Sequence, residues 1–380
     1  MQERLFTECV DIVGTACKPF EGEKTYVSTG AVDCDHISLL ETETIDYAGR
    51  PSRANLVVEA GDVIFAKMQA TQKTLLIDEE LAQNIYSTGF CAVRAKRNIL
   101  TNRCLYHLLT SDMFLSQKDK NCSGATQKAI TNAGLSKIRI QTPDIGEQDR
   151  ISVILDGLSD VIVKRKQELS LLDDLIKARF VEFFGDPRSN PFGYDKKPLG
   201  NTCKVITGNT PSRKVPEYYG DYIEWIKTDN IVSELLHPTK ASECLSEQGV
   251  LEGRIVDENA ILMACIAGSV ASIGRVCVTD RRVAFNQQIN AVVSEQYNIL
   301  FLYILLKISK DYLVEDINMA LKGILSKSKL EEKEFYVPPM ELQNEFAEFV
   351  KQVDKSKIEV QSALQETQLL LGSLMQDYFG

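Results

Sequence analysis

Residues that commonly build catalytic and metal sites are scarce in this sequence. The 380 residues include 3 His, at positions 36, 107 and 237, and this spacing fits neither a structural zinc site nor a catalytic triad. The glycine-rich loops that hold nucleotides, G-x-G-x-x-G and the Walker A loop, are both absent. The sequence therefore predicts a protein that is not an enzyme, with no catalytic residues, no cofactor and no metal ion.

Long hydrophobic runs and paired cysteines are also missing. No apolar run reaches the length of about 18 residues that a transmembrane helix needs, and no signal peptide opens the sequence. The 10 Cys form no C-x-x-C pair and no regular framework of the kind found in disulfide-bonded secreted proteins. We therefore expect a reduced, cytoplasmic protein with no membrane partner.

The sequence does contain an internal repeat at a spacing of 195 residues. Residues 143–185 align with 338–380 without a gap, and these segments end in VEFFG and QDYFG. Near the start of each copy, LFTECVDIVG (5–14) aligns with LGNTCKVITG (199–208) at an offset of 194. Matched pairs in the longer segment are Phe184 with Phe379, Leu169 with Leu364, Gln148 with Gln343 and Pro143 with Pro338. Because the offsets agree, we interpret the chain as two copies of about 190 residues, each globular first and helical last.

Apolar residues recur at alternating steps of four and three along both helical segments, from Ile151 to Phe183 and from Phe346 to Tyr378. This period of about 3.5 residues is typical of a coiled-coil seam. Each helix of about 40 residues would be roughly 60 Å long. Because the chain must return between them, the two helices most simply pack antiparallel, with a pseudo-twofold axis. A coiled coil between two chains is the alternative.

Each globular segment has short apolar runs between turn signals, which predict strands, and a longer run that predicts a helix. The predicted strands cover 56–68 (two strands), 89–95, 222–228, 259–267, 274–280 and 289–294, and the predicted helices are 104–117 and 300–316. The fold class is therefore α+β, with two tandem mixed α/β domains joined by a pair of long antiparallel coiled-coil helices. We place the first domain at 1–142, its helix at 143–185, the second domain at 186–337 and its helix at 338–380.

Charge is unevenly distributed around a net charge of −10. Residues 89–142 carry 9 basic and 2 acidic side chains, whereas the two helical segments together carry 9 basic and 16 acidic ones. Further basic residues cluster at Arg281–Arg282 and at Lys322, Lys327 and Lys329. This pattern fits a protein that holds phosphates with a few basic patches and has a basic partner. A solvated surface of mixed charge is the alternative.

Four stretches carry a resemblance to a known family. They are ITGNTPSRKVPEYYGDYIEWIKTDNI (206–231), AFNQQINAVV (284–293), GDVIFAKM (61–68) and GATQKAITNAGLSKIRIQTP (124–143). With the helix that runs to FFG, they resemble the specificity (S) subunit of type I restriction–modification systems over essentially the whole chain. The departures are Asn209, where Gly is common, and residues 13–24, which lack the Gly-Thr-Pro-Ser turn of that family.

The resemblance implies a non-catalytic subunit whose globular units are target-recognition domains. Each domain would read one half of a bipartite site in double-stranded DNA, and the helices would space the domains and dock two modification (methyltransferase) subunits. In that family the modification subunits carry S-adenosylmethionine and methylate adenine at N6, and restriction (endonuclease) subunits can join them and cut unmethylated DNA.

Polar residues in the loops of these stretches are candidates for contacting base edges and phosphates. In the first domain they are Lys67, Gln69, Thr126, Gln127 and Lys128; in the second they are Thr210, Ser212, Arg213, Lys227, Asn286, Gln287 and Lys322. A surface turn is the alternative for residues 123–128, and turn or strand-end hydrogen bonding is the alternative for Asn286 and Gln287. Trp225 is expected in the core rather than as a stacking platform.

Three other functions remain open from the sequence. One is the specificity subunit of a related multi-subunit restriction system that cleaves on both sides of its site. Another is a coiled-coil scaffold with two protein-binding domains, which predicts no salt-sensitive DNA binding. The third is a self-contained methyltransferase, which requires this chain alone to bind S-adenosylmethionine, and the absent glycine-rich loop speaks against it.

Overall fold

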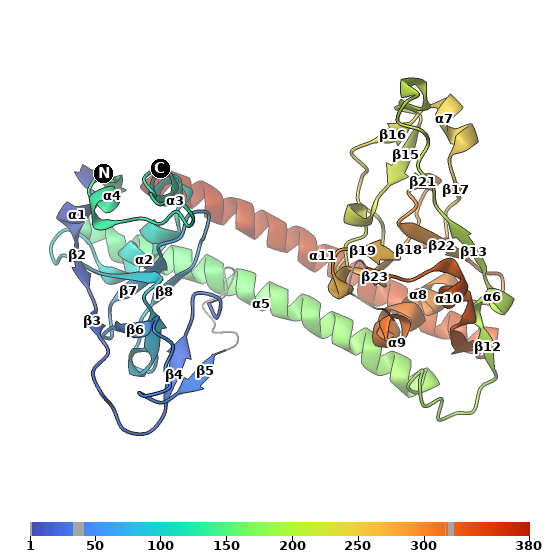
Figure 1. The fold of residues 1–380 in the computed structure, drawn as a ribbon, viewed down its shortest axis with the longest axis horizontal. Helices are drawn as coiled ribbons and strands as arrows, with labels where there is room; N and C mark the ends of the chain where they lie inside the picture. Colours follow the sequence, from blue (N-terminus) through green and yellow to red (C-terminus); the bar gives the residue numbers. More distant parts are fainter. Residues whose placement is uncertain (1, 33–41, 316, 318–322) are drawn as a thin grey trace. The chain divides into compact units, whose positions relative to one another are not determined.

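The computed structural model describes residues 2–32, 42–315, 317 and 323–380. The chain divides into two compact units: unit 1 is Met1–Gln167 with Gln361–Gly380, and unit 2 is Glu168–Val360. Two helices of 40 residues, α5 (Ile145–Phe184) and α11 (Met340–Phe379), each begin in one unit and end in the other (Figure 1). The two predicted long helices are therefore present, and each unit contains part of both.

Unit 1 is built on a four-stranded antiparallel sheet in the order β2–β10–β7–β8 and a five-stranded sheet in the order β3–β6–β9–β4–β5. The first sheet contains β2 (Val10–Val13), β10 (Phe90–Ala95), β7 (Val63–Ala66) and β8 (Thr74–Leu76). The second contains β3 (Thr15–Ala16), β6 (Ala54–Val57), β9 (Ile85–Ser87), β4 (Lys24–Val27) and β5 (Glu43–Ile45). Strand β1 (Gln2–Leu5) pairs with β11 (Arg139–Thr142). The helices are α1 (Phe6–Cys9), η1 (Leu81–Gln83), α2 (Asn102–Thr110), α3 (Asp112–Lys120) and α4 (Asn132–Leu135).

Unit 2 has a four-stranded sheet in the order β13–β22–β18–β20 and a five-stranded sheet in the order β14–β16–β15–β21–β17. The first contains β13 (Lys204–Thr207), β22 (Ile289–Val293), β18 (Ile261–Ala264) and β20 (Val276–Val278). The second contains β14 (Tyr219–Gly220), β16 (Cys244–Leu245), β15 (Ile223–Ile226), β21 (Val283–Phe285) and β17 (Ile255–Val256). Two further pairs are β12 (Lys196–Pro198) with β24 (Glu334–Tyr336) and β19 (Ile266–Ala267) with β23 (Gly323–Ile324). The helices are α6 (Leu199–Thr202), η2 (Pro216–Tyr218), η3 (Thr228–Asn230), α7 (Glu247–Glu252), η4 (Val270–Ser272), α8 (Ile299–Ile308), α9 (Lys310–Val314) and α10 (Lys327–Glu332).

The strand topology repeats between the units. In the four-stranded sheets, β2 pairs with β10 as β13 pairs with β22. Each five-stranded sheet contains one parallel pair, β4 with β9 and β15 with β21, among antiparallel neighbours. The internal repeat predicted from the sequence therefore extends from the helices into the sheets.

The predicted helices at 104–117 and 300–316 are each split by a serine. Ser111 has an extended backbone and stands between α2 and α3. Its hydroxyl donates to Leu108 O (2.7 Å) and accepts from the amide of Phe114 (3.2 Å), so it caps both helices. Ser309 separates α8 from α9 at the corresponding place in unit 2. A serine within a mostly apolar run leaves the helical period intact, so the pattern does not reveal the break.

In each four-stranded sheet, the inner strand β7 or β18 lies between two cores, and this explains its uninterrupted apolar sequence. In β7, Val63 and Phe65 belong to the cluster that includes α2, whereas Ile64 and Ala66 belong to the cluster shared with the five-stranded sheet. Successive side chains of a strand point to opposite faces, so both faces must be apolar. The same division holds for β18. The candidate residue Lys67 directly follows β7 and is therefore positioned by a strand buried on both faces.

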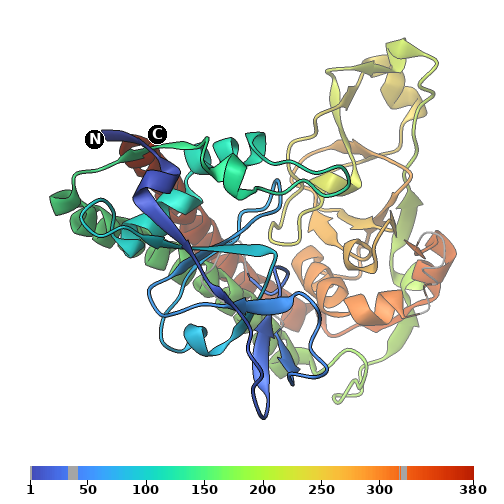
Figure 2. The ribbon, with the colours of Figure 1, turned by 60° about the vertical axis from the view of Figure 1, so that its left-hand side comes forward.

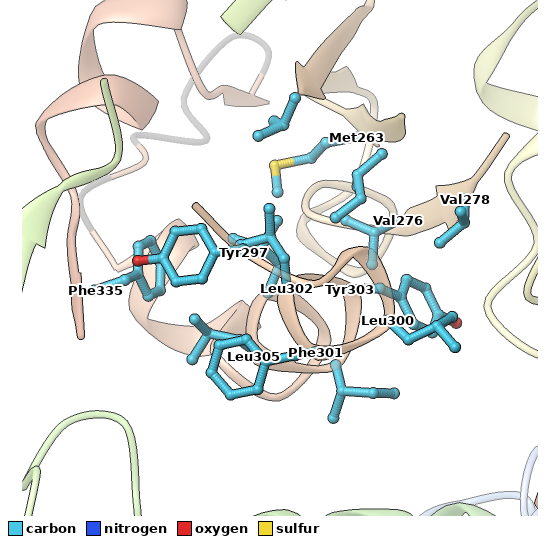
Figure 3. Packing of buried hydrophobic residues seen from close by; sticks show 14 of the residues in the cluster. Met263, Val276, Val278, Tyr297, Leu300, Phe301, Leu302, Tyr303, Leu305 and Phe335 are labelled. Atoms are coloured by element: carbon cyan, nitrogen blue, oxygen red, sulfur yellow. The ribbon is translucent and has the colours of Figure 1, made fainter. Parts of the chain in front are cut away.

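Helix α8 is apolar on nearly all sides because it lies in the middle of the unit 2 core. Figure 3 shows Leu302 facing Met263 and Val276, while Phe301 and Leu305 point to the other side of the helix. All five side chains are fully or almost fully buried. A helix with such a sequence is stable only when other elements cover it all round.

The repeated aromatic endings of the long helices are core residues. Phe184 of α5 and Phe379 of α11 are fully buried. The ring of Phe184 lies 4.7 Å from that of Phe301 in unit 2, and Phe379 shares a cluster with Phe6 in unit 1. Figures 1 and 2 both show the end of α11 close to β1. Both long helices end in a similar aromatic motif because each unit needs the end of one helix to complete its core. Replacing either Phe with Ala costs about 3–5 kcal/mol.

The long helices pack antiparallel within the chain. In unit 1, Ile151 and Leu155 from the start of α5 share a cluster with Leu371 near the end of α11. In unit 2, Phe180 near the end of α5 packs edge-on against Phe346 near the start of α11, with ring centroids 5.4 Å apart. The predicted antiparallel pair within one chain is confirmed.

In each unit, a cation at a seam position bonds to the opposite long helix. Arg165 donates to Ala363 O and to the hydroxyl of Thr367 in unit 1. Lys357, which is buried, donates to Asp173 Oδ1 (3.0 Å) in unit 2. Polar residues in a coiled-coil seam select one register, because any shift leaves them buried without partners.

A matched glutamine joins each long helix to its globular domain. Gln148 and Gln343 are both fully buried. Gln148 Oε1 accepts from the amide of Thr101 (2.8 Å), and Gln343 Oε1 accepts from the amide of Asn298 (2.9 Å); these two residues are the N-caps of α2 and α8. Gln148 Nε2 donates to Pro143 O and Ile99 O (both 2.9 Å), and Gln343 Nε2 donates to Pro338 O (2.8 Å). The repeated glutamine therefore satisfies backbone groups that the fold buries.

Candidate nucleic-acid interface

In unit 1, the two segments that carry predicted DNA contacts lie side by side. The amide of Gln69 donates to Lys128 O (3.0 Å), and the amide of Ile130 donates to Lys67 O (2.9 Å). These bonds join the loop at 123–129 to the segment that follows β7. The structure thus brings Lys67, Gln69 and Lys128 together.

The loop at 123–129 presents exposed polar side chains from a closed backbone. Thr126, Gln127 and Lys128 are all exposed. Two backbone hydrogen bonds of 3.0 Å between residues 123 and 129 close the loop. Gly124 has a φ of +136°, and a Cβ there would lie 2.4 Å from Gln127 O, so this position requires glycine. A closed loop of this kind holds its side chains outward at little cost in ordering.

Helix α3 braces the same surface through a buried lysine. Lys118 is 1% exposed, and its Nζ donates to Met68 O (3.1 Å) and Thr71 O (2.7 Å). Asp119 Oδ2 accepts from the amide of Ala70 (3.1 Å), a non-glycine residue with a φ of 56°. Sequence reasoning missed both residues, because Lys and Asp at the end of a helix are typical of an exposed surface.

The residues that follow β7 in unit 1 and β18 in unit 2 make the same pattern of backbone hydrogen bonds. The residue after β7, Lys67, donates its amide to Gly89 O (2.9 Å). The residue after β18, Cys265, donates its amide to Gln288 O (2.8 Å) and accepts from the amide of Leu325 (2.8 Å), as Lys67 accepts from residue 130. The turn at 286–288 is therefore the counterpart of the turn at 87–89, so the candidates Lys67 in unit 1 and Gln287 in unit 2 lie at corresponding edges of the two units.

In unit 2 the segment at 208–212 packs against the turn at 286–288. A Cβ on Gly208 would lie 2.1 Å from Asn286 O, so only glycine allows this approach. The amide of Asn209 donates to Phe285 O (3.2 Å), and the hydroxyl of Thr210 donates to Gln287 Oε1. These contacts bring the two sequence stretches of the predicted site together.

Asn209, where the resembled family has Gly, has its own structural role. Its Nδ2 donates to Glu252 O (2.6 Å), and its Oδ1 accepts from the amide of Arg254 (2.8 Å). Its carbonyl accepts from Trp225 Nε1 (3.3 Å). Trp225 is 3% exposed, so its predicted core position is confirmed.

Two cations of unit 2 meet on one carboxylate over an aromatic surface. Arg213 Nη2 and Lys227 Nζ each lie 2.6 Å from an oxygen of Glu243. The Arg213 guanidinium lies 4.3 Å from the ring centroid of Tyr219, and Lys227 Nζ lies 5.2 Å from that of Trp225. Cation–π contact and ion pairing together fix both side chains. Hydrogen bonds from Lys227 and then Arg213 hold the pKa of Glu243 below its usual value, so this carboxylate is ionised at neutral pH.

The remaining candidates of unit 2 differ in their exposure. Ser212 and Gln287 are exposed, whereas Asn286 is buried. Asn286 Nδ2 donates to Gln288 Oε1 (3.2 Å), and its Oδ1 accepts from the amide of Gln288 (3.1 Å), so its side chain stabilises the turn. Lys322 lies outside the described residues.

The basic cluster at Arg281–Arg282 is engaged within the unit. Arg281 binds both oxygens of Glu224, at 2.9 and 2.8 Å, and Arg282 lies 3.4 Å from Asp257. The bond from Arg281 lowers the pKa of Glu224. Arg281 is therefore bound within the unit, whereas the pair of Arg282 with Asp257 is exposed.

The described residues contain neither a cluster of metal ligands nor a membrane-spanning helix. Within 2–32, 42–315, 317 and 323–380, no three His, Cys, Asp or Glu side chains converge as metal ligands. Across the same ranges, no helix is both long and apolar enough to cross a bilayer.

A family model described as type I restriction modification DNA specificity domain matches residues 17–171 and 191–368. The specificity subunit of the type I restriction enzyme HindI from Haemophilus influenzae is 22% identical over 359 residues, with 74% of this chain and 76% of the relative covered. The specificity subunit of the type I restriction enzyme MjaIX from Methanocaldococcus jannaschii is 23% identical over 298 residues, with 71% of this chain and 66% of the relative covered.

Solved structures share the fold. A type I restriction–modification S subunit from M. genitalium has a TM-score of 0.60 at 13% identity, covering 100% of this chain and 96% of its own. A chain from a structure concerned with complex assembly and conformational transition of the type I R-M system has a TM-score of 0.55 at 21% identity, covering 99% and 97%. At these identities the likeness establishes the fold.

Proposed function

Because this chain belongs to the family of type I restriction modification DNA specificity domains, we propose that it is the DNA sequence-specificity subunit of such a system in the cytoplasm. Residues 1–142 and 186–337 are its target-recognition domains, and each reads one half of an interrupted site in double-stranded DNA. The chain contributes recognition, and other subunits contribute catalysis.

The corresponding edges of the two units carry this proposal. In each unit the strand buried on both faces leads into a residue whose amide and carbonyl both bond to neighbouring segments. The bonded segments include the loop with Lys128 in unit 1 and the turn with Gln287 in unit 2. Exposed Gln, Lys and Arg side chains on a rigid support suit base edges and phosphates, which supply specificity and affinity respectively. On this proposal, Lys67, Gln69, Thr126, Gln127 and Lys128 contact one half-site, and Thr210, Ser212, Arg213, Lys227, Gln287 and Lys322 contact the other. Asn286, whose side chain is turned inward, holds the turn that carries Gln287.

The long helices are the proposed docking surface for two modification subunits. Their outer faces expose large apolar side chains that this chain leaves uncovered, namely Val153, Val161, Leu171, Leu175, Ile358, Leu369 and Leu370. The helical segments are also acidic, which favours a basic partner surface over DNA. The modification subunits hold S-adenosylmethionine and methylate adenine at N6, and restriction subunits join the same complex.

The decisive experiment is a base-resolution map of N6-methyladenine in the source cell, with and without this gene. The proposal expects methylation to disappear at one interrupted, two-part motif and to return when the gene is restored. If deletion leaves every methylated motif intact while the modification subunit is expressed, the proposal is wrong. The purified complex should also bind a duplex containing the motif in a salt-sensitive way, whereas a protein-binding scaffold should not.

A further inference from the structure

Glu243 places an acidic group among the predicted DNA contacts of unit 2. An uncompensated carboxylate at such a surface repels phosphates and lowers affinity. Here it lies 2.6 Å from both Arg213 and Lys227, two of the three cations predicted to contact DNA in unit 2. The position of this carboxylate, between cations predicted to contact DNA, therefore needs an explanation.

Geometry fixes Arg213 from two directions. Its guanidinium lies over the ring of Tyr219, and Nη2 is held by Glu243. Tyr219 is itself anchored, because its hydroxyl donates to Pro211 O (2.6 Å) in the segment at 208–212. A guanidinium has five N–H donors in a rigid fork, so binding one nitrogen and one face orients the rest.

The ion pairs remain exchangeable with solvent. The side chains of Arg213, Lys227 and Glu243 are 56%, 27% and 36% exposed. Pairs this exposed are weak and are screened by salt, so an approaching phosphate competes with the carboxylate for both cations. Sequence-independent DNA binding depends on such phosphate contacts, whereas base readout depends on orientation.

We propose that Glu243 is a positioning residue that determines the specificity of unit 2. It holds Arg213 and Lys227 in the orientation used for base readout and withholds both cations from the phosphates of DNA that lacks the site. This inference rests on the proposed function of the chain as a DNA specificity subunit.

The test compares the Glu243→Gln variant with the unchanged chain, each assembled with its modification subunit. Binding is measured between about 50 and 200 mM salt on two duplexes. One carries the motif that is methylated in the cell, and the other has a random sequence. Each cation that is released to a phosphate steepens the slope of log affinity against log salt concentration by about 0.9. Over this fourfold range of salt, the extra loss of affinity is therefore roughly 3-fold for one contact and 12-fold for two. The variant should therefore bind random DNA more tightly at low salt, with a steeper salt dependence. Its affinity for the motif should not rise, so the ratio of specific to random binding should fall.

Two further variants separate positioning from net charge. Glu258→Gln removes the same charge at an exposed position and should leave the binding ratio unchanged. Adding Arg213→Gln and Lys227→Gln should abolish the effect of Glu243→Gln. If Glu258→Gln reproduces the effect, or if it persists without the two cations, the inference is wrong.

The remaining outcomes distinguish this inference from the proposed function. If the unchanged complex discriminates the motif but Glu243→Gln alters neither the ratio nor the salt dependence, the inference fails and the function stands. If the unchanged complex binds neither duplex in a salt-sensitive way, both fail. Thermal unfolding of each variant, followed by the fluorescence of Trp225, verifies that unit 2 is folded.

Discussion

Replacing Gln148 with Ala tests whether the repeated glutamine joins a long helix to its domain. The substitution leaves three backbone groups without a partner, the amide of Thr101 and the carbonyls of Ile99 and Pro143. Each buried, unpaired group costs about 1–3 kcal/mol. Because neighbouring costs are not additive, we expect unit 1 to lose about 3–6 kcal/mol of unfolding free energy.

The matched substitution in unit 2 is Gln343→Ala. It removes bonds to the amide of Asn298 and the carbonyl of Pro338, so the expected loss is about 2–5 kcal/mol. The control is Gln352→Ala, at an exposed position on α11, which should change stability by less than about 0.5 kcal/mol.

Two measurements locate these losses. Hydrogen exchange should accelerate at the amide of Thr101 in Gln148→Ala and at the amide of Asn298 in Gln343→Ala. Urea unfolding followed through Trp225, the single Trp of the sequence, reports on unit 2 and should shift for Gln343→Ala. If either variant is no less stable than Gln352→Ala, the argument from buried hydrogen bonds is refuted.

Three other substitutions have defined outcomes. Lys128→Ala should weaken binding of the complex to the first half-site and lower its salt dependence by about 0.9, and unchanged affinity in filter binding removes this residue from the interface. Lys118→Met should accelerate hydrogen exchange at the amides of Gln69 and residue 70 and should weaken DNA binding. Unchanged hydrogen exchange would show that Lys118 does not support this segment. Arg281 lowers the pKa of Glu224, so its contribution is present above the unfolded-state pKa of about 4.3 and is lost as the pH falls through the folded value. Glu224→Gln should therefore destabilise unit 2 by roughly 1–3 kcal/mol at pH 7 in urea unfolding, and this loss should shrink as the pH falls through the folded pKa of Glu224. A loss that does not change with pH refutes this account.

The long helices could be predicted from the sequence because two independent signals agreed. The heptad period gave the helices, and the 195-residue offset aligned Gln148 with Gln343 and Phe184 with Phe379. The order of strands could not be predicted, because β7 pairs with β10 across many residues and its apolar sequence fits any strand buried on both faces. The helix breaks at Ser111 and Ser309 were missed because a serine leaves the apolar period intact, and the hydrogen bonds by which Ser111 caps both of its helices depend on the folded backbone.

The candidate site could be predicted in part. Loop position and side-chain chemistry identified the segments around Gln69, Lys128 and Arg213, and the structure brings the stretches of each unit together. The supporting roles of Lys118 and Glu243 could not be predicted from the sequence. The burial of a lysine and the convergence of two cations on one carboxylate arise only from tertiary packing. Asn286 is turned inward by its bonds to residue 288, which its position in the sequence does not reveal.

The divided composition of unit 1 has a consequence for synthesis on the ribosome. Unit 2 is a continuous segment, so all of its residues are available once Val360 has left the exit tunnel. Unit 1 begins earlier but waits for Gln361–Gly380, which supply Phe379 to its core. The half that is translated first is therefore the half that finishes folding last. A stop codon between Val360 and Phe379 removes a core side chain from unit 1 and leaves every residue of unit 2 in place.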